Sequence, residues 1–150
     1  MVGLVLFSHA GLSDAFMDVL KMVAGEQEHV ASVGVSAGEK ADDVKSRLDE
    51  AIRATDAGCG VIVVTDLFGG SPANLALARL VPGKVEIVSG LNLAMLLKAI
   101  DLRMRKLEDP IVMARAMVRE GQENISLASD ILAKRSGGDG KSSRAAGGAG

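Results

Sequence analysis

Two residues that can do acid–base or nucleophilic chemistry follow the two most apolar segments of the chain. His9 follows the apolar stretch Val2–Phe7, and Asp66 follows the stretch GVIVVT. Such short apolar runs are typical of strands that are buried on both faces. The carboxyl ends of parallel strands meet at one edge of a sheet, where ligands bind in folds of this kind. If the two strands are neighbours, His9 and Asp66 can touch.

The segment LFGGSP comes directly after Asp66. Gly69 and Gly70 permit tight turns and a close approach of the backbone to a ligand. Ser71 and Pro72 are typical of the N-cap and first residue of a helix, so free N–H groups would point at the same place. The set therefore predicts a nucleophilic imidazole, a carboxylate that orients it, and a cradle for an anion.

Phosphoryl transfer through histidine needs such a set. A neutral imidazole has one ring nitrogen free to attack phosphorus, while Asp66 would hold the other N–H and stabilise the developing positive charge. The N–H groups around Gly70 and Ser71 would bind the phosphoryl oxygens. No cluster of potential metal ligands occurs near this edge in the sequence, so we expect neither a metal nor a cofactor.

Each feature alone also has an ordinary structural interpretation. A histidine after a strand is more often a turn or capping residue, Asp66 fits a simple turn acid, and GGSP is more often only a helix entry. Their convergence on one edge favours chemistry. His29, in EQEHV, has no such setting and is expected at the surface, and three methionines at helical spacings are expected in the core: Met95, Met113 and Met117.

Composition restricts the class of protein. The chain has 150 residues, a formal net charge of −2 and only three aromatic residues, all Phe. We expect one domain that does not bind nucleic acid, because such binders carry basic surfaces and aromatic stacking platforms. The sequence has no apolar stretch long enough to predict membrane insertion. Its one cysteine, Cys59, is expected to pack as a small core residue, and a reduced cytoplasm is the expected location of the protein.

Strand-like and helix-like periodicities alternate along the chain. Strands are expected at Val2–Phe7, Val30–Val35, Gly60–Thr65 and Lys84–Val88, and helices at Leu12–Ala24, Glu39–Thr55, 73–80, Asn92–Arg103 and from Pro110 to about Glu120. This order predicts an α/β fold with an open, mainly parallel, doubly wound sheet of about four strands flanked by helices. The segment ENISLASD, residues 123–130, alternates weakly and is expected to form an antiparallel edge strand. A disordered Gly/Ser/Ala tail is expected over residues 136–150.

With these residues in place, the chain resembles the IIA domain of the mannose family of the bacterial phosphoenolpyruvate-dependent sugar phosphotransferase system. The resemblance rests on VLFSHAGLSDAF, on GEQE after the first helix, on VVTDLFGGSPANLA and, more weakly, on VSGLNLAMLL. It covers roughly residues 1–130 and implies a IIA phosphocarrier domain over residues 1–135. No single motif is specific, but their combination and spacing are.

The resemblance implies a function for each site residue. His9 would accept a phosphoryl group from phospho-HPr and pass it to a IIB component, Asp66 would hydrogen-bond His9, and Ser71 would contact the phosphate. Phe68 stands where many relatives have Trp and is expected to face the partner proteins. The family's last, antiparallel edge strand is exchanged across a homodimer, which would give residues 123–130 a role and protect an exposed edge.

Other functions stay open at this point. A regulator that uses His9 phosphorylation as a switch, with no role in sugar transport, is the main alternative. The phosphocarrier subunit that serves dihydroxyacetone kinase is similar, but LFGGSP fits the mannose type better. A serine hydrolase would need G-x-S-x-G and a nucleotide-binding protein G-x-G-x-x-G, and neither motif is present at the expected place. The sequence names neither the sugar nor whether a IIB acceptor exists; a IIB acceptor would be on another polypeptide.

Overall fold

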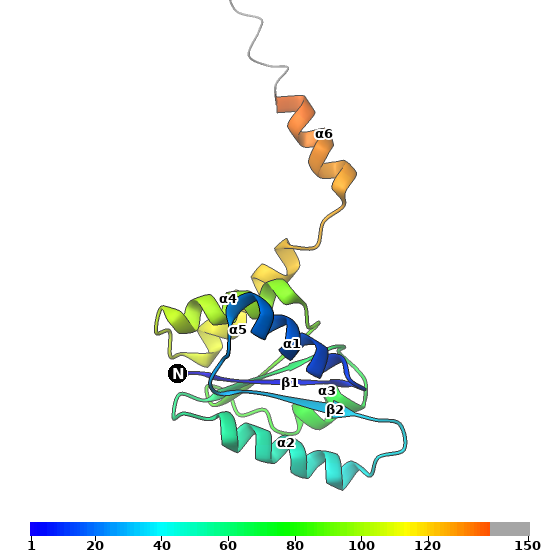
Figure 1. The fold of residues 1–150 in the computed structure, drawn as a ribbon, viewed down its shortest axis with the longest axis vertical. Helices are drawn as coiled ribbons and strands as arrows, with labels where there is room; N and C mark the ends of the chain where they lie inside the picture. The colour runs from blue at the N-terminus through cyan, green and yellow to red at the C-terminus, as the bar shows by residue number, and fades with distance from the viewer. Residues whose placement is uncertain (139–150) are drawn as a thin grey trace, which may run out of the picture.

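Four parallel strands form the centre of the molecule in the computed structural model, which describes residues 1–138. Their order across the sheet is β2-β1-β3-β4, and their bounds are β1 Gly3–His9, β2 Val30–Val35, β3 Val61–Thr65 and β4 Val85–Ser89. All three pairings are parallel (Figure 1). The expected α/β fold with an open parallel sheet is confirmed, and β1 and β3 are neighbours.

Helices cover both faces of this sheet. The described helices are α1 Leu12–Ala24, α2 Ala41–Thr55, α3 Ser71–Leu77, α4 Leu93–Met104, α5 Pro110–Glu123 and α6 Ala128–Gly138. Figure 1 shows α1, α4 and α5 on one face and α2 and α3 on the other. Each strand is therefore followed by a helix, and these strand-to-helix connections all lie at the same edge of the sheet.

The apolar character of the strands follows from burial on both faces. On β1, Leu4 and Leu6 pack toward α1, α4 and α5, whereas Val5 and Phe7 pack toward α2 and α3. All four are fully buried. Each such side chain contributes about 1.5–3 kcal/mol through removal from water. Among the methionines, Met95, Met113 and Met117 lie in the core as expected.

Asn92, from the motif VSGLNLAMLL, ties α4 to α5. Its side chain caps α4 by accepting a hydrogen bond from the Met95 N–H at 3.0 Å, and it donates to the Gly121 carbonyl at 3.1 Å. A Cβ at Gly121 would lie 2.9 Å from Met95 Cε, so glycine lets α5 approach α4 closely without displacing the end of the Met95 side chain. The motif thus has a packing role in α4 and α5.

Two local boundaries near the predicted site differ from expectation. Strand β1 runs on to His9, which pairs with Val35 of β2, so His9 ends the strand instead of following it. Gly70, in an extended conformation, is the N-cap of α3, and Ser71 is the first helical residue. The reason is that the Asn74 N–H donates to the Gly70 carbonyl at 3.0 Å, which starts the helix one residue earlier.

The predicted edge strand at residues 123–130 is not formed in the single chain, which offers no partner copy for the expected exchange. Glu123 ends α5, residues 125–127 have no regular structure, and α6 begins at Ala128. An edge strand needs a neighbouring strand to take its hydrogen bonds, and this segment instead leads away from the sheet (Figure 1). Without that neighbour, local helix propensity determines the conformation.

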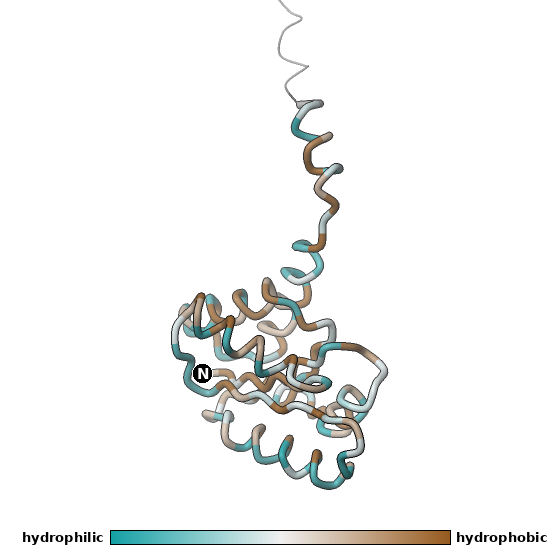
Figure 2. The backbone as a smooth tube through the Cα atoms, turned by 45° about the vertical axis from the view of Figure 1, so that its right-hand side comes forward, coloured by the Kyte–Doolittle hydropathy of each residue, from teal (hydrophilic) through white to brown (hydrophobic). Residues whose placement is uncertain are grey.

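Helix α6 extends through Gly138, so residues 136–138 of the expected tail are helical, and residues 139–150 lie outside the described part of the chain. Figure 2 shows apolar residues between α5 and α6 and along α6, away from the core. Ile125, Leu127 and Leu132 are 77 %, 64 % and 61 % exposed. Over the described residues, no helix combines the length and the apolar character that crossing a membrane requires.

Candidate functional site

His9 and Asp66 meet at the carboxyl end of the sheet, because β1 and β3 are adjacent and parallel. The main-chain N–H of His9 donates to Asp66 Oδ2 at 3.0 Å. Ring nitrogen Nδ1 lies 3.0 Å from Oδ2 and 3.2 Å from Oδ1 of the same carboxylate. The contact that the sequence predicted is therefore present, and it fixes both the backbone and the ring of His9.

The two partners differ in their exposure to solvent. The Asp66 side chain is 13 % exposed, whereas that of His9 is 50 % exposed. Burial raises the pKa of Asp66, but hydrogen bonds from the His9 main chain and ring outweigh it and hold this pKa below its ordinary value. An ionised carboxylate only accepts, so Nδ1 carries the proton in the neutral ring and Nε2 keeps its lone pair.

Gly70 lies directly against the free side of the imidazole. A Cβ at this position would be 3.1 Å from His9 Cε1 and 3.3 Å from Nε2. Its backbone φ of −153° is open to any residue, so the restriction is spatial. Its neighbour Gly69 has a φ of +93°, the left-handed region that glycine adopts without strain. Both glycines of LFGGSP are therefore needed for this geometry.

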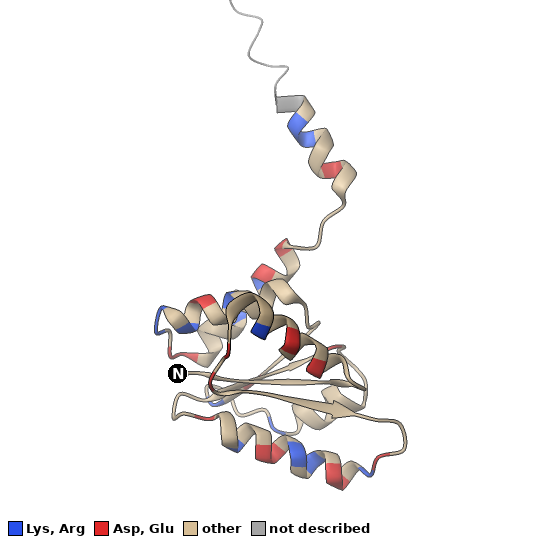
Figure 3. Cartoon of the chain, in the orientation of Figure 1, with Lys and Arg blue, Asp and Glu red and all other residues tan. Residues whose placement is uncertain are grey.

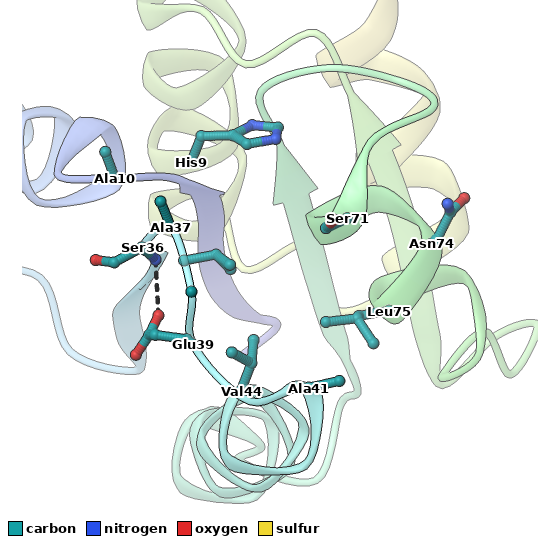
Figure 4. Close-up of a pocket in the computed structure, with 12 residues that line it drawn as sticks. His9, Ala10, Ser36, Ala37, Glu39, Ala41, Val44, Ser71, Asn74 and Leu75 are labelled. Atoms are coloured by element: carbon teal, nitrogen blue, oxygen red, sulfur yellow. Dashed lines mark hydrogen bonds between the residues drawn. The ribbon is translucent and has the colours of Figure 1, made fainter.

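A cavity of about 620 Å³ opens beside His9. Figure 4 shows it between the β2–α2 loop and α3, with His9 and Ser71 at its mouth and Val44 and Leu75 among its apolar lining. Ser71 is exposed, and its hydroxyl does not cap α3. This hydroxyl is thus available to a group bound at His9.

Glu39 fixes the loop that forms the opposite wall of this cavity. Its carboxylate accepts from the Ser36 N–H at 2.7 Å and from Arg47 at 2.7 Å (Figure 4 shows the first of these bonds). The Ser36 N–H is the main reason that the pKa of Glu39 lies below its ordinary value, with Arg47 adding to it and desolvation opposing it. The wall is therefore held by ionised Glu39.

Three features of the site were missed by the sequence analysis. Ala10, next to His9, has a φ of +48°, a left-handed conformation that is strained for alanine. Leu67, in the turn after Asp66, is 60 % exposed, and Leu12, three residues after His9 in the chain, is 43 % exposed. An apolar residue in the turn after Asp66 was the available signal for Leu67, whereas Leu12 is the first residue of α1 and nothing in the sequence marks Leu12 or Ala10 as part of the site.

Phe68 is 71 % exposed. Leu12 follows His9 by three residues, and Leu67 and Phe68 directly follow Asp66; we refer to these three exposed apolar residues as the apolar rim. Exposed large apolar side chains that cluster around a reactive group are typical of protein contacts. In Figure 3, charged residues lie mostly in the helices, notably α2.

The remaining candidates lie elsewhere. His29 is exposed, as expected, and it precedes β2 at the opposite end of the sheet. Cys59 is partly buried and packs against the core beside a second cavity of about 920 Å³ at that same end. Within residues 1–138, no group of three or more His, Cys, Asp or Glu side chains is arranged to hold a metal ion.

Comparison with known proteins identifies similar chains. The family model EIIA-man, described as PTS system fructose IIA component, matches residues 3–117. The mannose-specific EIIAB component of Escherichia coli K12 is 29 % identical over 104 residues, which are 68 % of this chain and 32 % of the relative. The chain thus matches about one third of that relative's length.

Two further relatives match over nearly their whole length. The fructose-specific EIIA component of Bacillus subtilis is 24 % identical over 136 residues, covering 89 % of this chain and 91 % of the relative. The crystal structure of the phosphotransferase system component EIIA from Streptococcus agalactiae superposes with a TM-score of 0.77 at 28 % identity, covering 87 % of this chain and 99 % of that one. Sequence family and fold therefore agree.

Proposed function

The chain belongs to the EIIA-man family of phosphotransferase system IIA components, and from that premise we propose that it is a phosphocarrier whose His9 receives a phosphoryl group from phospho-HPr and passes it to a IIB component. One observation carries the assignment of His9: Asp66 holds Nδ1 at 3.0 Å and leaves Nε2 free at the mouth of the cavity. A nucleophile oriented by a second group is the usual arrangement for covalent group transfer.

In the proposed reaction, the lone pair of Nε2 attacks phosphorus while the P–N bond to the donor histidine breaks. The donor imidazole keeps the electron pair of that bond, and the phosphoryl group becomes attached to Nε2 of His9. Positive charge develops on the His9 ring, and the Asp66 carboxylate stabilises it through Nδ1–H. Transfer to a IIB acceptor repeats the exchange, with His9 as the leaving group.

The phosphoryl oxygens would be bound by the turn Gly69–Ser71. Gly70 supports this role because its backbone lies against Nε2, where a Cβ would be only 3.3 Å away. The Ser71 hydroxyl lines the same cavity and is not used as a helix cap. Donors positioned before reaction stabilise the charge that spreads over these oxygens.

Phe68, with Leu67 and Leu12, would form the surface that docks HPr and the IIB component. The support is their exposure, 71 %, 60 % and 43 %, and their positions directly after Asp66 or three residues after His9 in the chain. Burial of such side chains against a partner excludes water from the site. The donor and acceptor would be cytoplasmic proteins, so the chain is proposed to act in the cytoplasm.

A homodimer is part of the proposal. The outer edge of β4 has no partner strand within the described residues, and the segment after α5 exposes Ile125 and Leu127. In a dimer, this segment of one copy would pair with the free edge of the other, a contact that a single chain does not offer. Removal of the chain after Glu123 should then convert dimers to monomers in sedimentation experiments.

The test is phosphorylation by purified components. Incubation with phosphoenolpyruvate, enzyme I and HPr should add one phosphoryl group by intact mass, and acid should remove it, as for a phosphohistidine. The label should require HPr and be absent in His9→Ala. An unlabelled, folded wild-type chain in the presence of charged HPr would overturn the proposal. A label that no IIB component accepts would favour the regulatory alternative.

A further inference from the structure

A hydrogen bond between two hydroxyl groups, one buried and one half-buried, connects the Asp66 turn to the neighbouring strand. Thr65, the residue before Asp66, is fully buried, and its Oγ1 lies 2.8 Å from the Oγ of Ser89 on β4. The two residues are register partners in the parallel pairing of β3 with β4. The sequence analysis assigned neither residue a role, and the site described above uses neither side chain.

The main chain reinforces this connection. The Thr65 carbonyl accepts hydrogen bonds from the N–H groups of Gly90 and Leu91, each at 3.0 Å. The last residue of β3 is therefore held by the turn that leads from β4 into α4. That turn is itself anchored, because Asn92 caps α4 and donates to the Gly121 carbonyl.

The hydroxyl pair lies on the same face of the sheet as the imidazole. Val61, Val63 and Phe7 pack toward α2 and α3, and Thr65 and His9 each follow two residues later on their strands. Thr65 is also the register partner of Phe7. Movement of Thr65 would therefore be transmitted through one peptide unit to Asp66.

Asp66 tolerates little movement. One carboxylate contacts both the main-chain N–H of His9 at 3.0 Å and Nδ1 at 3.0 Å. A shift of a few tenths of an ångström weakens one contact or the other, since hydrogen bonds depend steeply on distance and angle. Whatever fixes the end of β3 therefore fixes the tautomer of His9.

We infer that Thr65 and Ser89 are positioning residues for phosphoryl transfer: their hydroxyl pair holds the end of β3 so that Asp66 keeps His9 in the Nδ1–H tautomer with Nε2 free. This inference rests on the proposed function of His9. It adds a determinant from β4, a strand that contributes no residue to the cavity beside His9. Supporting residues of this kind set the alignment of reacting groups.

The experiment compares Ser89→Ala, Thr65→Val and the double variant. Each single change leaves one hydroxyl without its partner, but the main-chain bonds from Gly90 and Leu91 to Thr65 remain, so all three variants should fold. We expect each single variant to receive phosphate from phospho-HPr about 5- to 10-fold more slowly per folded molecule. The ¹⁵N chemical shifts of the His9 ring should show a smaller fraction of the Nδ1–H tautomer.

The double variant distinguishes a positioning role of the hydroxyl pair from an effect on stability alone. In Ser89→Ala the Thr65 hydroxyl keeps only a long hydrogen bond, 3.5 Å, to the Leu67 carbonyl. Replacement of both partners by apolar groups removes this poorly paired hydroxyl, so thermal stability should recover relative to Ser89→Ala. A positioning role predicts that the transfer rate and the tautomer fraction stay reduced. If both recover with stability, the inference is wrong. Thr65→Ser, which keeps the hydroxyl, should transfer at a near-normal rate.

Thr55→Val is the matched control. Thr55 is 3 % exposed, and its hydroxyl donates to the Ala51 carbonyl at 2.8 Å at the end of α2, where the chain leads to the opposite end of the sheet. Its loss should lower stability without a change in His9. Unchanged ¹⁵N shifts in Ser89→Ala would overturn the inference even if no phosphorylation occurs in the wild type. An unlabelled wild type with altered shifts in Ser89→Ala would instead count against the proposed function alone.

Discussion

The two ends of the parallel sheet contain similar elements in different arrangements. At the carboxyl end, Asp66 accepts from the main chain and ring of His9. At the amino end, Asp56 accepts from the N–H groups of Gly58 and Gly60 at 2.8 and 3.2 Å, next to Cys59. Each end thus has a cavity, a glycine-rich turn, an aspartate and a side chain of nucleophilic type.

The difference lies in what each aspartate holds. Asp56 holds only its own turn, and Cys59 Sγ lies 2.9 Å from the Met1 nitrogen, so the thiol is already engaged. Asp66 holds a side chain from another strand and leaves Nε2 unoccupied. The amino-end cavity is the larger, about 920 against 620 Å³. Cavity size therefore does not distinguish the two ends, whereas a free, oriented nucleophilic atom does.

The largest effect should follow removal of each nucleophile in turn. His9→Gln should abolish phosphoryl incorporation from phospho-HPr, because the glutamine amide has no nucleophilic ring nitrogen in the place of Nε2. Cys59→Ala should be labelled at the wild-type rate. Intact-mass kinetics on both variants measure this directly. Loss of labelling in Cys59→Ala at unchanged stability would show that the amino end of the sheet takes part in the transfer, contrary to the distinction drawn above.

The second-largest effect on the transfer rate should come from replacing Asp66, but not from replacing Asp56. Asp66→Asn should slow transfer about 100-fold, because the amide no longer selects the Nδ1–H tautomer or stabilises the charged ring. Asp56→Asn, which disturbs only a turn, should leave the rate per folded molecule unchanged. Single-turnover transfer from phospho-HPr provides the measurement, with the folded fraction determined by circular dichroism.

Asp66 should also affect the pH dependence of stability. Its pKa in the folded protein lies below the ordinary value of 3.8, so the ionised form stabilises the fold above pH 3.8. This contribution is lost as the pH falls below 3.8 through the lowered pKa. The difference in unfolding free energy between wild type and Asp66→Asn should shrink over that window in urea titrations. A constant difference would contradict the assigned hydrogen bonds.

Two glycines should give opposite outcomes. Gly70→Ala places a Cβ 3.3 Å from Nε2 at an unstrained φ, so stability should hold while transfer falls about 30-fold. Gly60→Ala combines a φ of +83° with a Cβ 2.5 Å from the Lys84 carbonyl oxygen. It should lose about 2 kcal/mol of stability and keep its rate. Equal effects on rate would remove the distinction between the two turns.

The smallest effect should come from the apolar rim. Phe68→Ala should slow transfer from phospho-HPr about 5-fold through weaker docking, with stability within about 0.5 kcal/mol of wild type. Met104→Ala is the matched control, since Met104 is 79 % exposed but ends α4, away from the site. Steady-state KM for HPr should rise only in the first variant. An unchanged KM in Phe68→Ala would exclude Phe68 from the docking surface.

Much of this arrangement could be predicted from the sequence because its signals are local. Buried strands such as Val61–Thr65 are nearly all apolar, and the order of strands and helices implies a parallel sheet whose carboxyl ends share an edge. His9 ends one such strand, and Asp66 and the GGSP turn follow another, so their convergence could be inferred. The segment at residues 123–130 failed because strand formation there depends on a neighbour that the single chain does not supply.

The sequence by itself determined the residue types and their order: an imidazole after one buried strand, a carboxylate and two glycines after another. Only the tertiary structure decided which nitrogen of His9 is held, how close Gly70 lies to the other, and that Ser89 of β4 supports Thr65. The physical reason is that the strength of a hydrogen bond changes when the donor–acceptor distance changes by a few tenths of an ångström. Such distances arise from the packing of strands that are far apart in the chain.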